Sequence, residues 1–288
     1  MNIAFWSDED GCGTTSGMAA IASVCTDVWN LKTILLQSSN QEGDLEQKLG
    51  GGRMADASSV MAADRMQPDC MVKETSSYGA WDAWDMLSEM EHGLTSEGLL
   101  EYLVPVVKGR MYYLPQRARR KQDAYPESEK EAVCRGIRMA EQISDITLID
   151  CGSGRDPMAE LLLSQADAAV VTISQERQNL DAYFQNRYVL RENTIYLVNQ
   201  YHQDSIYNKK NLNRLFRLCE EELAVIPHNP VFRYISGQGK LERFVRRHKS
   251  CRVFDRQFYF MQELIHTTGM LLQAADFKKI VQQRKESR

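Results

Sequence analysis

A glycine-rich segment near the start of the chain has the residues needed to bind a phosphate group. Two glycines alternate with a cysteine, and three hydroxyl-bearing residues follow. Glycines let successive backbone N–H groups converge on one anion, and a helix N-terminus behind them adds the positive end of its dipole. An ordinary glycine-rich turn would use the same residue types. Features elsewhere in the chain are therefore needed to distinguish a phosphate-binding loop from such a turn. The residues concerned are Gly11, Cys12, Gly13, Thr14, Thr15 and Ser16.

The charge of this segment is opposite to what a polyphosphate requires. Loops of this kind carry a lysine that reaches the β- and γ-phosphates of a nucleotide. Thr14 stands at that position, and Asp8, Glu9 and Asp10 precede the glycines. A carboxylate about 4–6 Å from a phosphate would be repelled by about 1–4 kcal/mol. We therefore predict a phosphate-binding backbone without its fixed cation.

Two polar residues that end apolar runs could serve the same site. Asp150 ends one apolar run and precedes a second glycine-rich stretch. Gln37 ends another apolar run, and its amide can orient water but cannot take up a proton at neutral pH. Asp150 could equally mark only the end of a strand.

The elements that must position these residues alternate between strands and helices. Short apolar runs predict strands at 1–6, 32–37, 109–115, 145–150, 168–173, 193–200 and 223–226. Helical spacing or composition predicts helices at 17–26, 79–102, 127–144 and 157–164. Parallel strands need long crossovers of this kind. We therefore predict an α/β fold with a doubly wound, mostly parallel sheet and helices on both of its faces.

Length and composition bound the class of protein. At 288 residues, with 43% hydrophobic and 26% charged residues, the chain is long enough for one large α/β domain. We predict a single domain over 1–288, in which about 255–288 forms a C-terminal helical extension. The apolar runs are shorter than a membrane span and the N-terminus lacks a signal-peptide design, so we expect a cytoplasmic protein. The formal charge of −4 disfavours DNA as a partner.

Basic surface clusters, the C-terminal tail and the cysteines are less specific signals. Basic residues gather at 117–121 and 243–249, where they fit a docking surface or a solvated helix face. The tail 276–285 has a thin apolar face that fits weak contact with a membrane surface or a frayed helix end. Seven scattered cysteines read as reduced structural thiols, including Cys12 and Cys151, which have acidic neighbours.

Residues 1–22 resemble the start of the MinD/ParA group of P-loop ATPases, whose motif reads roughly Lys-Gly-Gly-x-Gly-Lys-Thr-Thr. On that motif, Glu9 replaces a signature lysine, Asp10 replaces a glycine and Thr14 replaces the Walker A lysine. The Walker A motif is therefore degenerate. The resemblance implies a P-loop NTPase fold, a homodimer, and ATP or ADP with Mg²⁺ as the cofactor.

The resemblance continues along the chain. Asp150 and the glycines after it match the Walker B strand and the switch II segment of that group, so the resemblance implies that Asp150 and the Thr15 hydroxyl hold Mg²⁺. Gln37 ends the strand that in that group usually ends in an acid near the metal and the attacking water. The resemblance therefore makes Asp150 and Gln37 the catalytic candidates if the chain is active. Asn199 matches the residue that reads adenine, for which an amide has both a donor and an acceptor, although a turn after a strand also favours asparagine. Pro227 matches the turn that follows the closing strand, beside the nucleotide.

Within this group the chain is most similar to the TadZ/CpaE-type proteins, which help to place and assemble Flp (Tad) pili or related secretion machinery. The likeness rests on Trp6-Ser7, the lysine-free loop, and the segments 109–115 and 226–229. It predicts a localisation or assembly scaffold with weak or no ATP hydrolysis, partnered by pilus or secretion proteins at the inner face of the cell membrane.

Two other functions remain open at this stage. One is an active ParA- or MinD-type ATPase that positions DNA or cargo and borrows a cation, for example from Arg155. The other is a metal- or small-molecule-responsive binding module built on the acidic loop.

Overall fold

The computed structural model describes residues 1–38, 44–50, 95–115, 125–185 and 193–276. Several sequence predictions fall outside these residues: most of the helix at 79–102, the basic cluster at 117–121, and the tail from 277 onward. Of the first, residues 95–102 are described, and within them 98–102 form the short 3-10 helix η3 (Gly98–Tyr102) in place of an α-helix.

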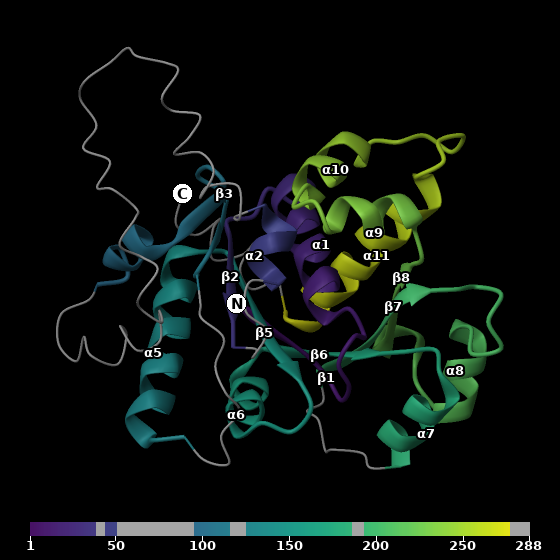
Figure 1. The fold of residues 1–288 in the computed structure, drawn as a ribbon, viewed down its shortest axis with the longest axis horizontal. Helices are drawn as coiled ribbons and strands as arrows, with labels where there is room; N and C mark the ends of the chain where they lie inside the picture. The colour runs from purple at the N-terminus through teal and green to yellow at the C-terminus, as the bar shows by residue number, and fades with distance from the viewer. Residues whose placement is uncertain (39–43, 51–94, 116–124, 186–192, 277–288) are drawn as a thin grey trace.

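The core of the protein is an eight-stranded sheet with the strand order β3-β4-β2-β5-β1-β6-β7-β8 (Figure 1). Every neighbouring pair is parallel except β3 and β4, which are antiparallel. The predicted mostly parallel sheet is confirmed. The strands are β1 (Asn2–Ser7), β2 (Thr33–Gln37), β3 (Val104–Val107), β4 (Met111–Tyr113), β5 (Ile146–Ser153), β6 (Ala168–Ile173), β7 (Thr194–Tyr201) and β8 (Leu223–Pro227).

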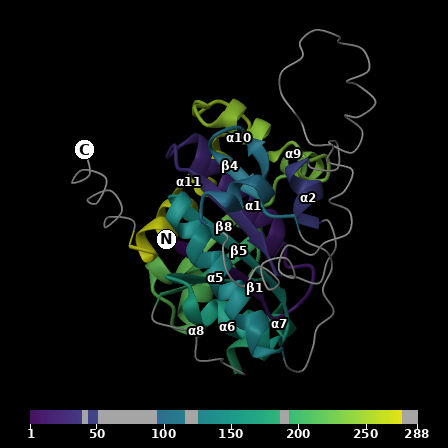
Figure 2. The ribbon, with the colours of Figure 1, turned by 90° about the vertical axis from the view of Figure 1, so that its left-hand side faces the viewer.

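Helices cover both faces of the sheet, as predicted (Figures 1 and 2). One face carries α1 (Thr14–Asp27), α2 (Asp44–Leu49), α9 (Pro230–Ser236), α10 (Leu241–His248) and α11 (Phe258–Ala274). The other face carries α5 (Glu127–Ile143), α6 (Pro157–Gln165), α7 (Arg177–Gln185) and α8 (Lys209–Phe216). A short 3-10 helix, η4 (Glu220–Glu222), precedes β8. Among these described helices, none is both long and apolar enough to cross a membrane.

The sequence of β1 is largely apolar because the strand is buried on both faces of the sheet. Side chains alternate between the two faces of a strand, and both faces of this sheet are covered. Ile3 and Phe5 therefore pack under α1 and α11, whereas Ala4 and Trp6 pack under α5 and α6. All six residues of β1 are buried. The burial fixes the strand in the middle of the sheet and thereby fixes the loop that follows it.

Helix α11 protects one edge of the sheet. It packs against β8, the last strand, and Thr267 inserts its hydroxyl at the backbone of Val225. Thr267 Oγ1 donates to the Val225 carbonyl at 2.7 Å and accepts from the Val225 N–H at 3.3 Å. Edge strands present unpaired backbone groups, and this hydroxyl satisfies a donor and an acceptor at once.

We expect Thr267→Val to lower the free energy of unfolding by about 1–3 kcal/mol, because it leaves two buried backbone groups without a partner. Thr267→Ser keeps the hydroxyl and should cost less. Thr268→Val is the matched control, since the Thr268 hydroxyl bonds only to the Leu264 carbonyl within its own helix. Urea denaturation followed by circular dichroism measures all three, and equal losses for Thr267→Val and Thr268→Val would contradict the role of Thr267.

Candidate functional site

The loop between β1 and α1 has the backbone of an anion-binding turn. Gly11 and Gly13 have φ angles of +83° and +82°, a region that glycine adopts without steric cost. Gly13 is the N-cap of α1, and no side chain caps the helix there. The first turn of α1 also contains no acidic residue. The N–H groups at this helix end therefore have no side-chain cap, and their binding to a phosphate stays a prediction.

Strands β5, β1, β6 and β7 run parallel, so their carboxyl ends lie side by side at one end of the sheet. The glycine loop lies at this carboxyl end. Asp150 and Asn199 lie on β5 and β7, and Gln37 and Pro227 end the neighbouring strands β2 and β8. The predicted hydroxyl residues 14–16 form the first turn of α1. Ligands bind at the carboxyl end in open α/β sheets.

Asp150 and Thr15 are brought together although 135 residues separate them. Thr15 Oγ1 donates to Asp150 Oδ2 at 2.6 Å, and the Gly152 N–H donates to Asp150 Oδ1 at 2.9 Å. Asp150 is fully buried. A carboxylate beside a hydroxyl is a set of hard oxygen donors, which is what Mg²⁺ prefers. These two residues therefore fit the metal that the sequence assigned to them.

Gln37 lies next to Asp150 across the sheet. The two residues are partners in the register of β2 and β5, and the Ser38 N–H donates to the Asp150 carbonyl at 2.7 Å. Pro227 is buried at the end of β8, opposite Tyr201 of β7. The predicted site residues on the strands thus lie at the same carboxyl end of the sheet.

Asn199 holds the loop in place, a role that the sequence reasoning missed. Its Nδ2 donates to the Gly13 carbonyl at 2.7 Å, and its Oδ1 accepts from the Gln200 N–H at 2.9 Å. A Cβ atom on Gly13 would lie 2.4 Å from Asn199 Nδ2. The Asn199 amide already bonds through both its donor and its acceptor, so its predicted contact with adenine stays a prediction.

Thr14 is the first residue of α1, at the position where the sequence resemblance places a lysine. Its side-chain hydroxyl is buried and has no hydrogen-bond partner among the described residues. A buried polar group without a partner costs about 1–3 kcal/mol, and an anionic oxygen or a water molecule would remove that cost. The backbone and the hydroxyls at this site therefore fit a phosphate group, whereas the residue at the lysine position supplies no charge.

The acidic segment before the glycines is tied to the end of β5. The Ser153 hydroxyl donates to the Asp10 carboxylate, and the Ser7 hydroxyl donates to the Glu9 carbonyl at 2.8 Å. The Gly154 N–H donates to the Ser7 carbonyl at 2.8 Å. Within the described residues, no group of three or more His, Cys, Asp or Glu side chains is placed to hold a metal ion. That finding gives no support to the third function, a metal-responsive module built on these acids.

The charge of this segment acts on the thiol of Cys12. Burial raises the Cys12 pKa to about 11, with further increases from Glu9, Glu176, Asp10 and Asp8 in that order. Burial, and then Asp150, raise the Cys151 pKa well above its usual value. Both thiols are therefore protonated at neutral pH, which agrees with their predicted structural role.

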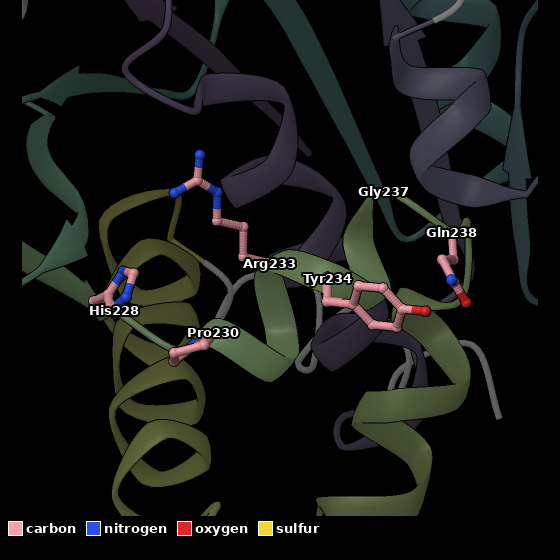
Figure 3. Close-up of a pocket in the computed structure, with 6 residues that line it drawn as sticks. All are labelled: His228, Pro230, Arg233, Tyr234, Gly237 and Gln238. Carbon is pink, nitrogen blue, oxygen red and sulfur yellow. The ribbon is translucent and has the colours of Figure 1, made fainter.

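A pocket of about 640 Å³ lies where β8 passes into α9 (Figure 3). In Figure 3 the Tyr234 ring points toward Gln238, whereas the Arg233 guanidinium points away from both. The His228 ring stacks on His202 with 4.6 Å between ring centroids. Burial, His202 and Arg233 lower the His228 pKa, in that order. The lining residues are His228, Pro230, Arg233, Tyr234, Gly237 and Gln238.

This pocket adds a basic group that the sequence reasoning did not single out. Arg233 is exposed and forms no ion pair among the described residues. Its position shortly after Pro227 was the available signal, because α9 begins directly after the end of β8.

Comparison with known proteins gives a result at the level of the fold. No family model matches the chain, and no curated protein matches it significantly. Among solved structures, MinD in the MinC:MinD complex of Aquifex aeolicus aligns over 94% of this chain and 96% of its own, with 18% identity and a TM-score of 0.63. The chain has the MinD/ParA P-loop fold.

Two further structures support that assignment. The ParA family ATPase of Chlorobium tepidum covers 95% of this chain and 98% of its own, with 14% identity and a TM-score of 0.62. MinD of Pyrococcus horikoshii, solved with Mg-ADP, covers 93% of each chain, with 16% identity and a TM-score of 0.60. The MinD/ParA fold accounts for the order of the strands and for the glycine loop after β1.

The contact between Gly13 and Asn199 gives a test with an internal control. Gly11→Ala and Gly13→Ala place a side chain at nearly the same φ, which costs about 1–2 kcal/mol at either position. A Cβ on Gly11 meets nothing within 4 Å, whereas one on Gly13 overlaps Asn199. We expect Gly13→Ala to lower the free energy of unfolding by about 1–3 kcal/mol more than Gly11→Ala.

The double variant Gly13→Ala/Asn199→Ala removes the overlap. Its loss of stability should be smaller than the sum of the two single losses, as measured by denaturant unfolding. Additive losses would show that Asn199 does not confine the loop.

The rate at which Cys12 is alkylated depends on its thiol pKa, which burial and the acidic residues around it raise. Because its pKa is raised to about 11, we expect the rate with iodoacetamide to rise about tenfold per pH unit from pH 8 to pH 10 without reaching a plateau. Glu9→Gln should speed the reaction at pH 8, since it removes the charge that raises the pKa most after burial. Mass spectrometry of the Cys12 peptide follows the rate, with the exposed Cys219 as the internal reference. A plateau at or below pH 9 would contradict the raised pKa.

Proposed function

We propose that this chain is a MinD/ParA-like P-loop protein that acts as a localisation or assembly scaffold for a Flp (Tad)-type pilus or a related secretion system. It binds nucleotide weakly and turns it over slowly or not at all. The observation that carries the proposal is the pairing of Thr15 with Asp150 beside a loop in which Glu9 and Thr14 stand in place of two lysines.

The residues present can hold parts of a nucleotide. Thr15 and Asp150 would hold Mg²⁺, and the N–H groups around Gly13 and the start of α1 would bind phosphate oxygens. Mg²⁺ would neutralise charge on the phosphates when it is bound. Phosphoryl transfer depends on positioning and charge neutralisation, and the acidic loop opposes the second of these.

Catalysis also needs a group that orients the attacking water and accepts its proton. Gln37 beside Asp150 can donate and accept hydrogen bonds to a water molecule, but it cannot accept that water's proton at neutral pH. Asp150 is already bonded to Thr15 and Gly152. Both features support binding without efficient turnover.

One observation favours the rival function, an active ATPase that positions DNA or cargo. Arg233 stands in the pocket at the end of β8 and forms no ion pair among the described residues. It could supply the missing positive charge, as could the exposed Arg155 that follows Gly154. Arginine binds phosphate well because its planar fork offers several donors.

The partners and location belong to the same proposal. We infer a homodimer at the inner face of the cell membrane, with pilus or secretion proteins as partners, because the sequence is most similar to the TadZ/CpaE-type proteins. Neighbouring genes for a secretion ATPase, a prepilin peptidase and small pilins would support this assignment. A neighbouring gene for a ParB-like protein would favour the partition function.

Restoring the lysine tests the nucleotide site. We expect Thr14→Lys to tighten binding of Mg-ATP by roughly 10- to 100-fold, because a charged hydrogen bond contributes about 1.5–3 kcal/mol. Isothermal titration calorimetry measures the affinity, and phosphate release measures turnover. Thr14→Val is the control, since it removes the hydroxyl without adding charge.

The wild-type turnover decides between the two functions. A rate near 1 s⁻¹ or above, the lower end of the usual range for enzymes, would contradict the scaffold function. If that rate were lost in Arg233→Ala or Arg155→Ala, the borrowed cation would be identified. Unchanged affinity in Thr14→Lys would show that the loop does not face the phosphates.

A further inference from the structure

Helix α10 and the turn after it carry a strong local positive charge. Residues 240–256 contain seven basic and two acidic side chains, a net charge of +5, whereas the whole chain has −4. The remaining residues therefore carry −9. The basic residues are Lys240, Arg243, Arg246, Arg247, Lys249, Arg252 and Arg256.

The charge lies on the outer side of α10. Leu241, Phe244 and Val245 are buried, and they belong to the same core cluster as α1. The arginines of this helix are exposed. Helix packing thus fixes which side of α10 faces the solvent, and the basic side chains lie on that side.

Most of these arginines form no ion pair within the part of the chain that the structure describes. Arg246 pairs with Glu242 at 3.0 Å, and Lys249 Nζ donates to the Asp27 carbonyl at 2.9 Å. Four arginines form no ion pair among the described residues, so their charge is available to an external anion. These are Arg243, Arg247, Arg252 and Arg256.

The turn between α10 and α11 presents two apolar side chains next to this charge. Val253 is 69% exposed and Phe254 is 99% exposed. Asp255 closes the turn, since its carboxylate accepts from the Arg252 N–H at 2.6 Å and its own N–H donates to the Arg252 carbonyl at 2.8 Å. Figure 1 shows this turn projecting beyond the helices, away from the sheet. A fully exposed phenylalanine loses the stabilisation of about 1.5–3 kcal/mol that burial would give it.

We propose that α10 and the α10–α11 turn form a docking surface for a bilayer rich in anionic phospholipid. Val253 and Phe254 insert among the acyl chains near the headgroups, and the four unpaired arginines contact the lipid phosphates. Apolar tips flanked by basic residues suit such an interface, because burial of the tip and attraction to the anionic surface add together.

A membrane fits these observations better than duplex DNA. Phosphates on DNA would attract the arginines but would give Val253 and Phe254 no apolar environment at the backbone. The −9 on the rest of the chain would oppose a long polyanion that extends past the surface, whereas a flat bilayer meets only the projecting turn.

This proposal names the surface that would contact the membrane. It rests on the proposed function only in taking the inner face of the cell membrane as the location of the protein. No nucleotide is involved, so lipid binding and nucleotide binding are measured separately and either can fail alone.

Co-sedimentation of the full-length chain with vesicles tests the surface. Vesicles of phosphatidylglycerol and phosphatidylcholine supply the anionic bilayer, and pure phosphatidylcholine vesicles are the neutral reference. We expect binding to the anionic vesicles alone, weakening as salt rises. Phe254→Ser should weaken it roughly tenfold or more, and Arg252→Gln/Arg256→Gln roughly 25-fold, at about fivefold per arginine.

Matched substitutions on α8 and before it provide controls. Ile206→Ser removes an exposed apolar side chain, and Lys210→Gln/Arg214→Gln removes two exposed charges elsewhere. Both should bind vesicles as the wild type does, and thermal melting confirms that every variant is folded.

Three results would overturn the proposal. The first is the absence of wild-type binding to anionic vesicles. The second is equal weakening by the variants of the turn and by the control variants. The third is a gel shift of duplex DNA, lost in Arg252→Gln/Arg256→Gln, without vesicle binding.

Discussion

The burial of β1 on both faces is the constraint from which the site follows. A strand that contacts helices above and below cannot shift its register, because a shift of one residue would exchange its two sets of side chains. The carboxyl end of β1 is therefore fixed between the ends of β5 and β6. The glycine loop begins at that end, and the Asn199 amide on β7 holds the other end of the loop through the Gly13 carbonyl.

This frame places an unusual set of charges where a nucleotide phosphate would lie. Thr15 Oγ1 donates to Asp150 Oδ2 at 2.6 Å, and these are the two residues proposed to hold Mg²⁺. Asp8, Glu9 and Asp10 bring negative charge to the same loop, and the raised pKa of Cys12 reflects that charge together with burial. The proposed function, binding that serves assembly more than turnover, rests on the pair of Thr15 and Asp150 and on the absence of any basic residue from residues 7–16.

Positive charge is concentrated elsewhere in the molecule. The pocket at the start of α9 contains Arg233 and His228. Helix α10 and the turn after it carry four arginines that form no ion pair among the described residues, two on the helix and two in the turn. The protein therefore separates an acidic loop at the carboxyl end of the sheet from a basic surface beside an exposed apolar turn. Such a separation lets one chain meet two different partners, one at each surface.

Local pattern was enough to predict much of this architecture. The apolar runs and glycines fixed the strands, the helices that flank Asp150, and the parallel sheet, because each of these depends on neighbouring residues. The segment 109–115 also read correctly as a strand, although its antiparallel neighbour β3 was not foreseen. A pattern of apolar residues reports burial but not which strands become partners.

Four features depended on contacts between distant segments. These are the hydrogen bond from the Asn199 amide to the Gly13 carbonyl, the hydrogen bonds of the Thr267 hydroxyl to the backbone of β8, the pocket around Arg233, and the exposure of Phe254. The sequence by itself determined most of the element types and the absence of lysine from the glycine loop, since both are properties of residues close together in the chain. Only the tertiary structure decided which polar groups meet and which apolar groups stay outside the core, because both depend on how the helices pack on the sheet.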